Sequence, residues 1–171
     1  MRTFWVALIL SCLAAQVNAE IPAAWRVRST DGYFQTLILD GYTRSERFRS
    51  LVDRLNQSDV VVYVEAHRRT DARYNGYLLA DVRVGGQNRY LRIRLKARGA
   101  RDIMVGVVAH ELQHALEVAE APHVRDADTF HAHFQRIDNG SCSISCYETT
   151  AAEQTEAAVL RDLREGGRTR R

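Results

Sequence analysis

Two histidines near the middle of the chain have the spacing to hold a metal ion. They occur in the sequence His110-Glu-Leu-Gln-His114. On an α-helix, residues four apart lie on the same face, one turn above the other. Zn²⁺ binds neutral imidazole nitrogens at about 2.0–2.1 Å, so two such histidines can supply half of a tetrahedral site. Glu111 would then lie beside the ion, where its carboxylate can take a proton from a metal-bound water.

The residues around this pattern favour a helix with an apolar surface. No proline or glycine occurs from Val107 to Ala121, and Glu111 is the only acidic or basic residue before Glu117, the histidines apart. An apolar surround limits solvent at a metal site and fixes the rotamers of the ligands. The alternative interpretation is a half-buried helix whose histidines are hydrogen-bonded and whose Glu111 is solvated.

The sequence from His110 to His114 resembles the active-site helix of the zincin metallopeptidases. The resemblance covers this short segment only. It implies a zinc-dependent peptidase in which the two histidines hold the ion and Glu111 is the general base. The metzincin group of this family places Gly three residues after the second His and a further ligand three residues later. Here these positions hold Glu117 and Glu120, so the chain departs from the metzincin pattern.

The gluzincin group, which takes a third ligand from a later helix, implies Glu148 as that ligand. The chain departs from the E-x-x-x-D form of this group, because Ala152 stands where that form has an aspartate. Small residues follow Glu148 and would let a final helix approach the metal helix closely. Glu153 and Glu156 are the rivals, of which Glu153 faces elsewhere and Glu156 lies about two turns deeper. The sequence leaves the choice between Glu148 and Glu153 open.

Other polar residues near these positions have two interpretations each. Glu117 lies one turn beyond His114, either as a second-shell group that supports a ligand or as a solvated charge. Tyr147 could polarise the scissile carbonyl group, or it could pack at the start of the last helix. His131 and His133 are two residues apart and do not share a helix face, so they do not form a pair site.

Residues 1–19 have the order of features found in a cleaved export signal. Arg2 precedes an apolar run from Phe4 to Ala15, and small residues stand before Glu20. The run is too short to remain as a membrane span. We therefore expect an exported protein, periplasmic or secreted. The alternative is lipoprotein anchoring through Cys12.

Two cysteines remain after the signal, and both lie in a short loop. In an exported chain, this even pair predicts a disulfide between Cys142 and Cys146. The alternative is two free thiols.

Length and charge indicate one domain that does not bind nucleic acid. We expect a single metallopeptidase-like domain over residues 20–165 and a flexible basic tail over 166–171. The chain has 24 basic and 21 acidic residues, which is a net charge of +3. This excess of positive charge is too small to indicate a surface that binds a polyanion such as nucleic acid. The expected partner is a peptide or protein substrate.

Apolar periodicity predicts an α+β fold with an N-terminal helix, antiparallel strands and a mostly helical second half. Thr43 is expected to cap a helix over 44–57, after a turn at Thr30-Asp31-Gly32. Strands are expected at Val60–Glu65, Tyr77–Val84 and Tyr90–Lys96, the last two as a hairpin. Leu91, Ile93 and Leu95 alternate with charged residues and predict one buried face.

Three helices are expected after residue 100. Asp102 would cap the metal helix, which would end near Ala121-Pro122. Asp126 or Asp128 would cap a short helix, and the last helix would open at Tyr147-Glu148 and run to about Arg164. The function expected is an exported zinc-dependent peptidase, with Tyr90–Lys96 as an exposed edge that pairs with substrate. The alternative is a noncatalytic binding or structural domain, with a structural metal or none.

Overall fold

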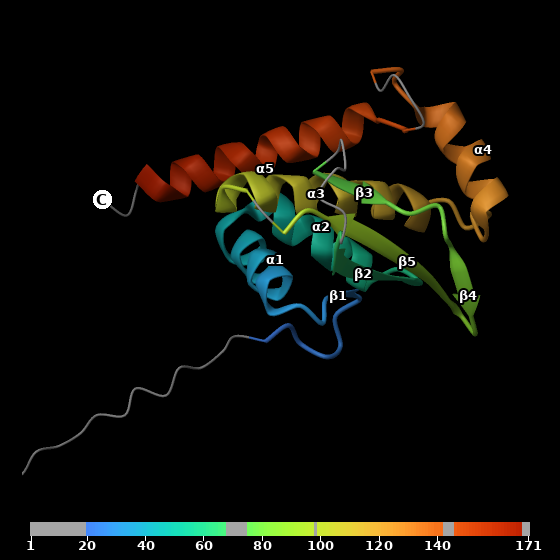
Figure 1. Ribbon diagram of the computed structural model, residues 1–171, viewed down its shortest axis with the longest axis horizontal. Helices are drawn as coiled ribbons and strands as arrows, with labels where there is room; N and C mark the ends of the chain where they lie inside the picture. Colours follow the sequence, from blue (N-terminus) through green and yellow to red (C-terminus); the bar gives the residue numbers. More distant parts are fainter. Residues whose placement is uncertain (1–19, 68–74, 98, 142–145, 169–171) are drawn as a thin grey trace, which may run out of the picture.

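The computed structural model describes residues 20–67, 75–97, 99–141 and 146–168. They form an α+β fold in which a mixed sheet belongs to the first half of the chain and the second half is mostly helical (Figure 1). The elements in chain order are β1 (Val27–Arg28), α1 (Gly32–Arg44), α2 (Glu46–Asn56), β2 (Val60–Ala66), β3 (Gly76–Leu78), β4 (Arg83–Gly85), β5 (Asn88–Leu95), α3 (Arg101–Ala119), α4 (Ala127–Ile137) and α5 (Thr150–Arg168).

The sheet is mixed, so the expectation of antiparallel strands was wrong in part. Its order is β1-β2-β5-β3, with β4 also paired to β5. The pairs β1–β2 and β2–β5 are parallel, whereas β3 and β4 run antiparallel to β5. The strand expected as an exposed edge, Tyr90–Lys96, corresponds to β5, which lies inside the sheet between β2 and β3. The edge beside the helical half is therefore β3.

The predicted hairpin is confirmed at its turn but not over its length. Strands β4 and β5 pair across a turn in which Gly86 has a φ of 59°, a left-handed conformation that favours glycine. The expected strand Tyr77–Val84 is broken between Leu78 and Arg83. Asp81 lies in this break and forms ion pairs with Arg83 and Arg92.

Helix α1 was not predicted, because Thr30-Asp31-Gly32 was taken as a turn. The Asp31 side chain instead caps the helix by accepting the Tyr33 backbone N–H at 2.8 Å. The buried residues of α1 have helical spacing, and these are Phe34, Leu37, Ile38 and Gly41. Helix α2 was predicted, but its cap is Ser45 and not Thr43. Gly41 allows the two helices to pack closely, since a Cβ there would lie 2.6 Å from the Phe48 ring.

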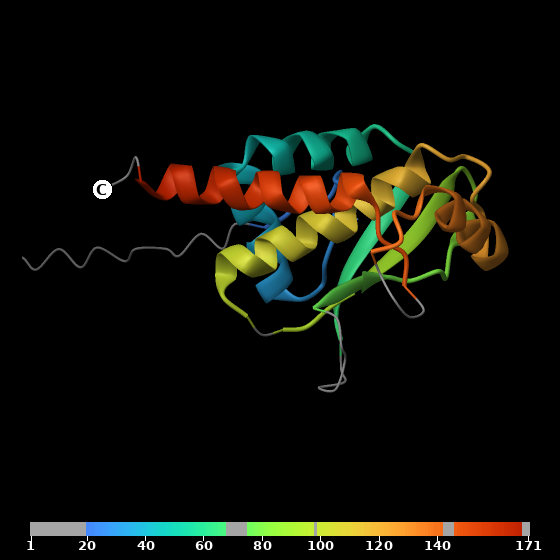
Figure 2. The ribbon, with the colours of Figure 1, turned by 90° about the horizontal axis from the view of Figure 1, so that it is seen from above.

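Helix α3, which carries the two histidines, lies between the sheet and α5 (Figure 1), and α5 crosses over it when the fold is seen from above (Figure 2). It packs against α1, α2, α5 and three strands. Asp102 is not its cap: the capping position is Ala100, and Asp102 pairs with Arg44 at 2.8 Å. The helix ends at Ala119, two residues before the predicted end. An element packed on so many sides is a rigid base for a site.

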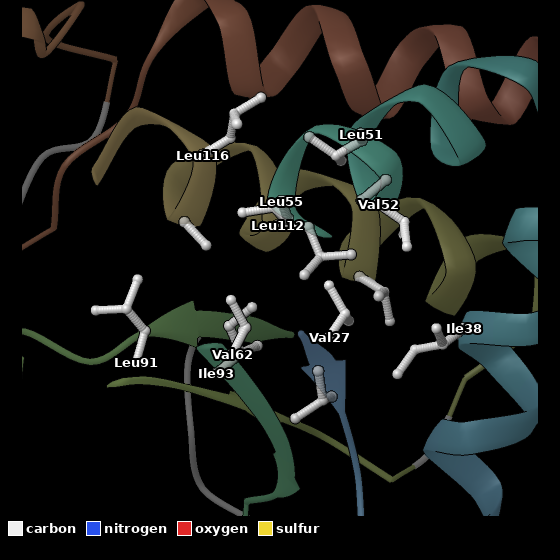
Figure 3. Packing of buried hydrophobic residues seen from close by; sticks show 14 of the residues in the cluster. Val27, Ile38, Leu51, Val52, Leu55, Val62, Leu91, Ile93, Leu112 and Leu116 are labelled. Atoms are coloured by element: carbon white, nitrogen blue, oxygen red, sulfur yellow. The ribbon is translucent and has the colours of Figure 1, made fainter. Parts of the chain in front are cut away.

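One continuous apolar core joins α3 to the sheet. Side chains of α2 and α3, including Leu55 and Leu112, meet those of β2 and β5, including Val62 and Ile93 (Figure 3). The predicted alternation in β5 is confirmed, because Leu91, Ile93 and Leu95 are all fully buried. The alternation also extends one step further back than expected, to Arg89.

Arg89 is buried and binds the C-terminal end of α3. Its guanidinium group donates to both carboxylate oxygens of Asp59, at 2.7 and 2.8 Å. It also donates to backbone carbonyl groups at and after the end of the helix, those of Val118, Ala119, Ala121 and Val124. Carbonyl groups at the end of a helix lack intrahelical partners. The Arg89 side chain supplies these partners and fixes where the chain leaves α3.

The last two helices, α4 and α5, form in the regions where the sequence predicts helices. Asp126 caps α4 through a capping box with Thr129, as one of the two expected alternatives. Helix α5 begins at Thr150, after Tyr147 and Glu148, and continues to Arg168 through residues expected to belong to a tail.

Among the helices described, none has the length and apolar character needed to cross a membrane. The export signal at 1–19, with Cys12, lies outside the described residues, as do Cys142 and the last residues of the tail.

Candidate metal centre

Three side chains from two parts of the chain form a group that could hold a metal ion. His110 and His114 come from α3, and Glu148 comes from the segment just before α5. One ligand atom from each lies within 4.8 Å of those of the other two. The Nε2 atoms of His110 and His114 are 3.2 and 3.8 Å from Glu148 Oε1. All three side chains are at least four-fifths shielded from solvent.

Each histidine has a second carboxylate on its other ring nitrogen. His110 Nδ1 lies 3.1 Å from Glu156 of α5, and His114 Nδ1 lies 2.9 Å from Glu117 of α3 itself. Metal-ligating histidines usually donate this second N–H to a carboxylate or carbonyl oxygen, which fixes the tautomer and the ring orientation. Both rings therefore present Nε2 to the same point, the Glu148 carboxylate.

The backbone around Glu148 is fixed on both sides, while Glu153 is directed elsewhere. The Glu148 backbone N–H donates to the Asp138 side chain, and its carbonyl accepts from the Asn139 backbone, both at 2.8 Å. The Glu153 carboxylate instead accepts from the side chains of Asn139 and Ser141. The structure thus brings Glu148 to the histidines and not Glu153. The helix start expected at Glu148 is wrong by two residues, because Thr149 caps α5.

Neighbouring charges and hydrogen bonds shift the pKa values of His110 and Glu148. Burial of the His110 ring favours the neutral form, but hydrogen bonds to Glu148 and Glu156 overcome it and raise the His110 pKa to about 10. Burial likewise favours neutral Glu148, but the hydrogen bond from His110 leaves the Glu148 pKa below its ordinary value. In the metal-free protein, His110 therefore carries the proton that a metal ion would displace.

Glu111 is buried beside the group. Burial raises the pKa of its carboxyl group, although the charges of His114 and His110 act against this. The backbone of Leu78 in β3 approaches the carboxylate and also acts against this rise. Gly76 in the same strand allows this approach, since a Cβ there would lie 3.2 Å from Glu111 Cγ and 2.4 Å from the Leu95 side chain. The edge strand and the metal helix thus meet at Glu111.

A pocket of about 550 Å³ opens over these residues. Residues of β3 and those that follow it to Ala80 line this pocket, as do residues of α4 and of the segment before α5. Tyr147 belongs to this segment and is stacked on Phe134 at a ring-centroid distance of 5.8 Å. The Tyr147 hydroxyl group is 3.2 Å from His131 Nδ1. His131, which was expected only not to form a pair site with His133, also lines the pocket.

The roles of two polar residues of this centre, Glu156 and Thr149, were not predicted from the sequence. Glu156 was weighed only as a rival ligand, and its carboxylate contacts the far nitrogen of His110. Thr149 was noted only as a small residue, although it is buried and hydrogen-bonded on several sides. Its position directly before a helix of small and acidic residues was the signal of an N-cap that could have found it.

Comparisons of the chain with protein-family models, with curated proteins and with solved structures found no match. The geometry of His110, His114 and Glu148 is therefore the main indication of function.

Proposed function

We propose that the protein is a zinc-dependent hydrolase that cleaves peptide bonds. One observation supports this proposal most strongly: His110, His114 and Glu148 present three ligand atoms within 4.8 Å of one another, and the buried Glu111 lies next to the two histidines in sequence. Export through residues 1–19 belongs to the same proposal. The disulfide between Cys142 and Cys146 stays a prediction.

The donor set fits zinc. Two imidazoles and one carboxylate are the protein ligands of a common class of catalytic zinc site, which keeps the fourth position for water or substrate. Both imidazoles have carboxylate partners on Nδ1, as ligating histidines usually do. When bound, the ion would act as a Lewis acid and lower the pKa of a water molecule that it coordinates.

Glu111 is the proposed general base. It would accept the proton of the attacking water and later return it to the departing amine nitrogen. Its raised carboxyl pKa suits both steps, because a group that binds and releases a proton works best with a pKa near the operating pH.

The edge of β3 is the proposed surface for an extended peptide, in place of β5. Tyr77 pairs with Arg94 of β5, and the backbones of Asn75 and Leu79 also hydrogen-bond to that strand. The backbone groups of Gly76 and Leu78 therefore point away from β5, and both residues line the pocket. A peptide added to this edge would run directly past Glu111.

Tyr147 and His131 are the proposed stabilisers of the carbonyl oxygen. Their hydrogen-bonded pair lines the same pocket as the edge of β3. A phenol or imidazole that donates to this oxygen stabilises the charge that develops on it in the transition state.

Replacement of the proposed base tests the function. Glu111→Gln keeps the shape of the side chain and removes its basicity, so kcat/KM on a library of fluorogenic peptides should fall by about 10²–10⁴-fold. Bound zinc should stay at the parent level. Glu120→Gln, at the C-cap of the same helix, is the matched control, since Glu120 is more than half exposed and pairs with Arg54.

Two results would contradict the proposal. Equal activity of Glu111→Gln and the parent would remove Glu111 from the mechanism. A zinc-loaded parent that hydrolyses no peptide would instead favour a structural metal in a noncatalytic domain.

A further inference from the structure

Thr149 touches both halves of the metal centre. It lies between Glu148 and the first residue of α5 and is only 3% exposed. Its backbone N–H donates to Glu148 Oε1 at 2.9 Å. Its hydroxyl oxygen lies 2.7 Å from Glu117 Oε1 and accepts the Ala152 backbone N–H at 3.1 Å. One residue therefore contacts the candidate third ligand, the partner of a candidate histidine ligand and the first turn of α5.

The direction of these hydrogen bonds is fixed by the groups involved. The Ala152 backbone N–H can only donate, so the Thr149 hydroxyl oxygen must accept from it. An ionised carboxylate can only accept, so the single hydroxyl proton must go to Glu117. The hydroxyl group thus has two separate tasks, to cap α5 and to hold Glu117.

Glu117 hydrogen-bonds both to Thr149 and to His114, so it connects these two residues. One carboxylate oxygen accepts from Thr149, and the other lies 2.9 Å from His114 Nδ1. The Glu117 side chain is only 10% exposed, so water competes little for either oxygen. The carboxylate plane is fixed by a partner on each oxygen, and it fixes the His114 ring in turn.

We propose that Thr149 is a positioning residue that connects Glu148 to His114 through Glu117 and so sets the separation of these two metal ligands. The inference depends on the proposed metal site. His114 and Glu148 come from different elements, 34 positions apart. Their ligand atoms must nevertheless be held together before an ion arrives, because an ion binds most tightly to ligands that do not have to move.

The test compares variants by zinc affinity, measured through competition with a chromophoric chelator. Thr149→Val keeps the shape and removes the hydroxyl group, and it should weaken zinc binding by about tenfold, the effect of one hydrogen bond to a charged group. Thr149→Ser keeps the hydroxyl group and should bind zinc like the parent. Thr150→Val is the matched control, since Thr150 is the exposed neighbour.

A second pair of variants separates positioning from capping. Thr149→Asp keeps a strong helix cap but has no proton for Glu117, so it should fold and still bind zinc more weakly. In a Glu117→Ala background, Thr149→Val should cause little further loss of zinc affinity, because residues that act through one another are not additive. Melting of metal-free Thr149→Val in the Glu117→Ala background, where the bond to Glu117 is already absent, reports the capping contribution.

The outcomes are distinct. Parent-like zinc affinity in Thr149→Val or Thr149→Asp overturns the inference and leaves the proposed function in place. A full additional loss in the Glu117→Ala background also overturns it, because Thr149 would then act by capping only. A parent protein that binds no zinc overturns both the function and the inference.

Discussion

Helix α3 has two buried polar clusters, and they differ in how their charges are balanced. At its C-terminal end, Arg89 is neutralised by Asp59, and its remaining donors go to backbone carbonyl groups. In the middle of the helix, two imidazoles are surrounded by four carboxylates, those of Glu111, Glu117, Glu148 and Glu156. The first cluster is balanced by its own residues, whereas the second has more negative than positive charge.

This difference separates a structural cluster from one built for a ligand. A buried charge is costly unless it is paired and hydrogen-bonded. The Arg89 cluster meets this condition, and the hydrogen bonds from Arg89 lower the pKa of Asp59. The histidine cluster does not meet it, and a proton on His110 offsets only part of the excess. A divalent cation that displaces this proton would bring two positive charges in place of one and so offset more of the excess, which is the electrostatic reason to expect a metal ion.

The comparison predicts that the Arg89 cluster governs stability but not metal binding. Arg89→Met should lower the free energy of unfolding by about 3 kcal/mol, the low end of the range for breaking a buried ion pair, because Asp59 is still 39% exposed. Zinc affinity of the folded variant should change little. Urea unfolding and chelator competition measure the two quantities. A large loss of zinc affinity with unchanged stability would show that the Arg89 cluster serves metal binding and not stability.

The histidine cluster should show the opposite behaviour. Glu148→Ala removes a proposed ligand, so its zinc affinity should fall by more than the roughly 10–100-fold that loss of a second-shell partner costs. Glu153→Ala is the matched control, because Glu153 lies five positions on and its carboxylate hydrogen-bonds to Asn139 and Ser141. Circular dichroism should show that both variants fold. If Glu153→Ala loses zinc and Glu148→Ala keeps it, the ligand assignment is wrong.

The last difference is a pH dependence confined to the metal-free protein. The His110 pKa is raised from 6.5 to about 10 on folding, so its contribution to stability is complete below about pH 6.5 and disappears as pH rises toward 10. The free energy of unfolding of metal-free protein should therefore fall between pH 7 and 9.5, and less so in His110→Gln. Identical pH profiles for the two proteins would show that His110 has no raised pKa.

The metal helix could be predicted from the sequence because its signals are local. The spacing of His110 and His114 and the absence of helix breakers specify both the helix and the shared face. Helix α1 also has a local signal, the spacing of Phe34, Leu37 and Ile38, which the turn-like residues before it obscured. Extending the alternation of β5 back by two residues would have placed Arg89 on the buried face.

The parts that could not be predicted depend on contacts between distant segments. Parallel pairing of β2 with β5 makes β3 the edge strand, and no local pattern encodes which strands pair. The sequence leaves the choice between Glu148 and Glu153 open, because helical spacing does not apply to Glu148, which lies before the first residue of α5. Its place at the histidines comes from hydrogen bonds to Asp138 and Asn139, which only the folded chain brings together.

The most direct test of the central claim is the metal content of the purified protein. The mature chain, prepared without metal-chelating resin and analysed by inductively coupled plasma mass spectrometry, should contain about one zinc ion per chain. The described part of the chain has one His₂Glu group, which supplies the protein ligands of one site. A variant with both His110→Ala and His114→Ala should contain almost none. Absence of a stoichiometric metal from the parent, or equal zinc in the parent and this variant, would contradict the account.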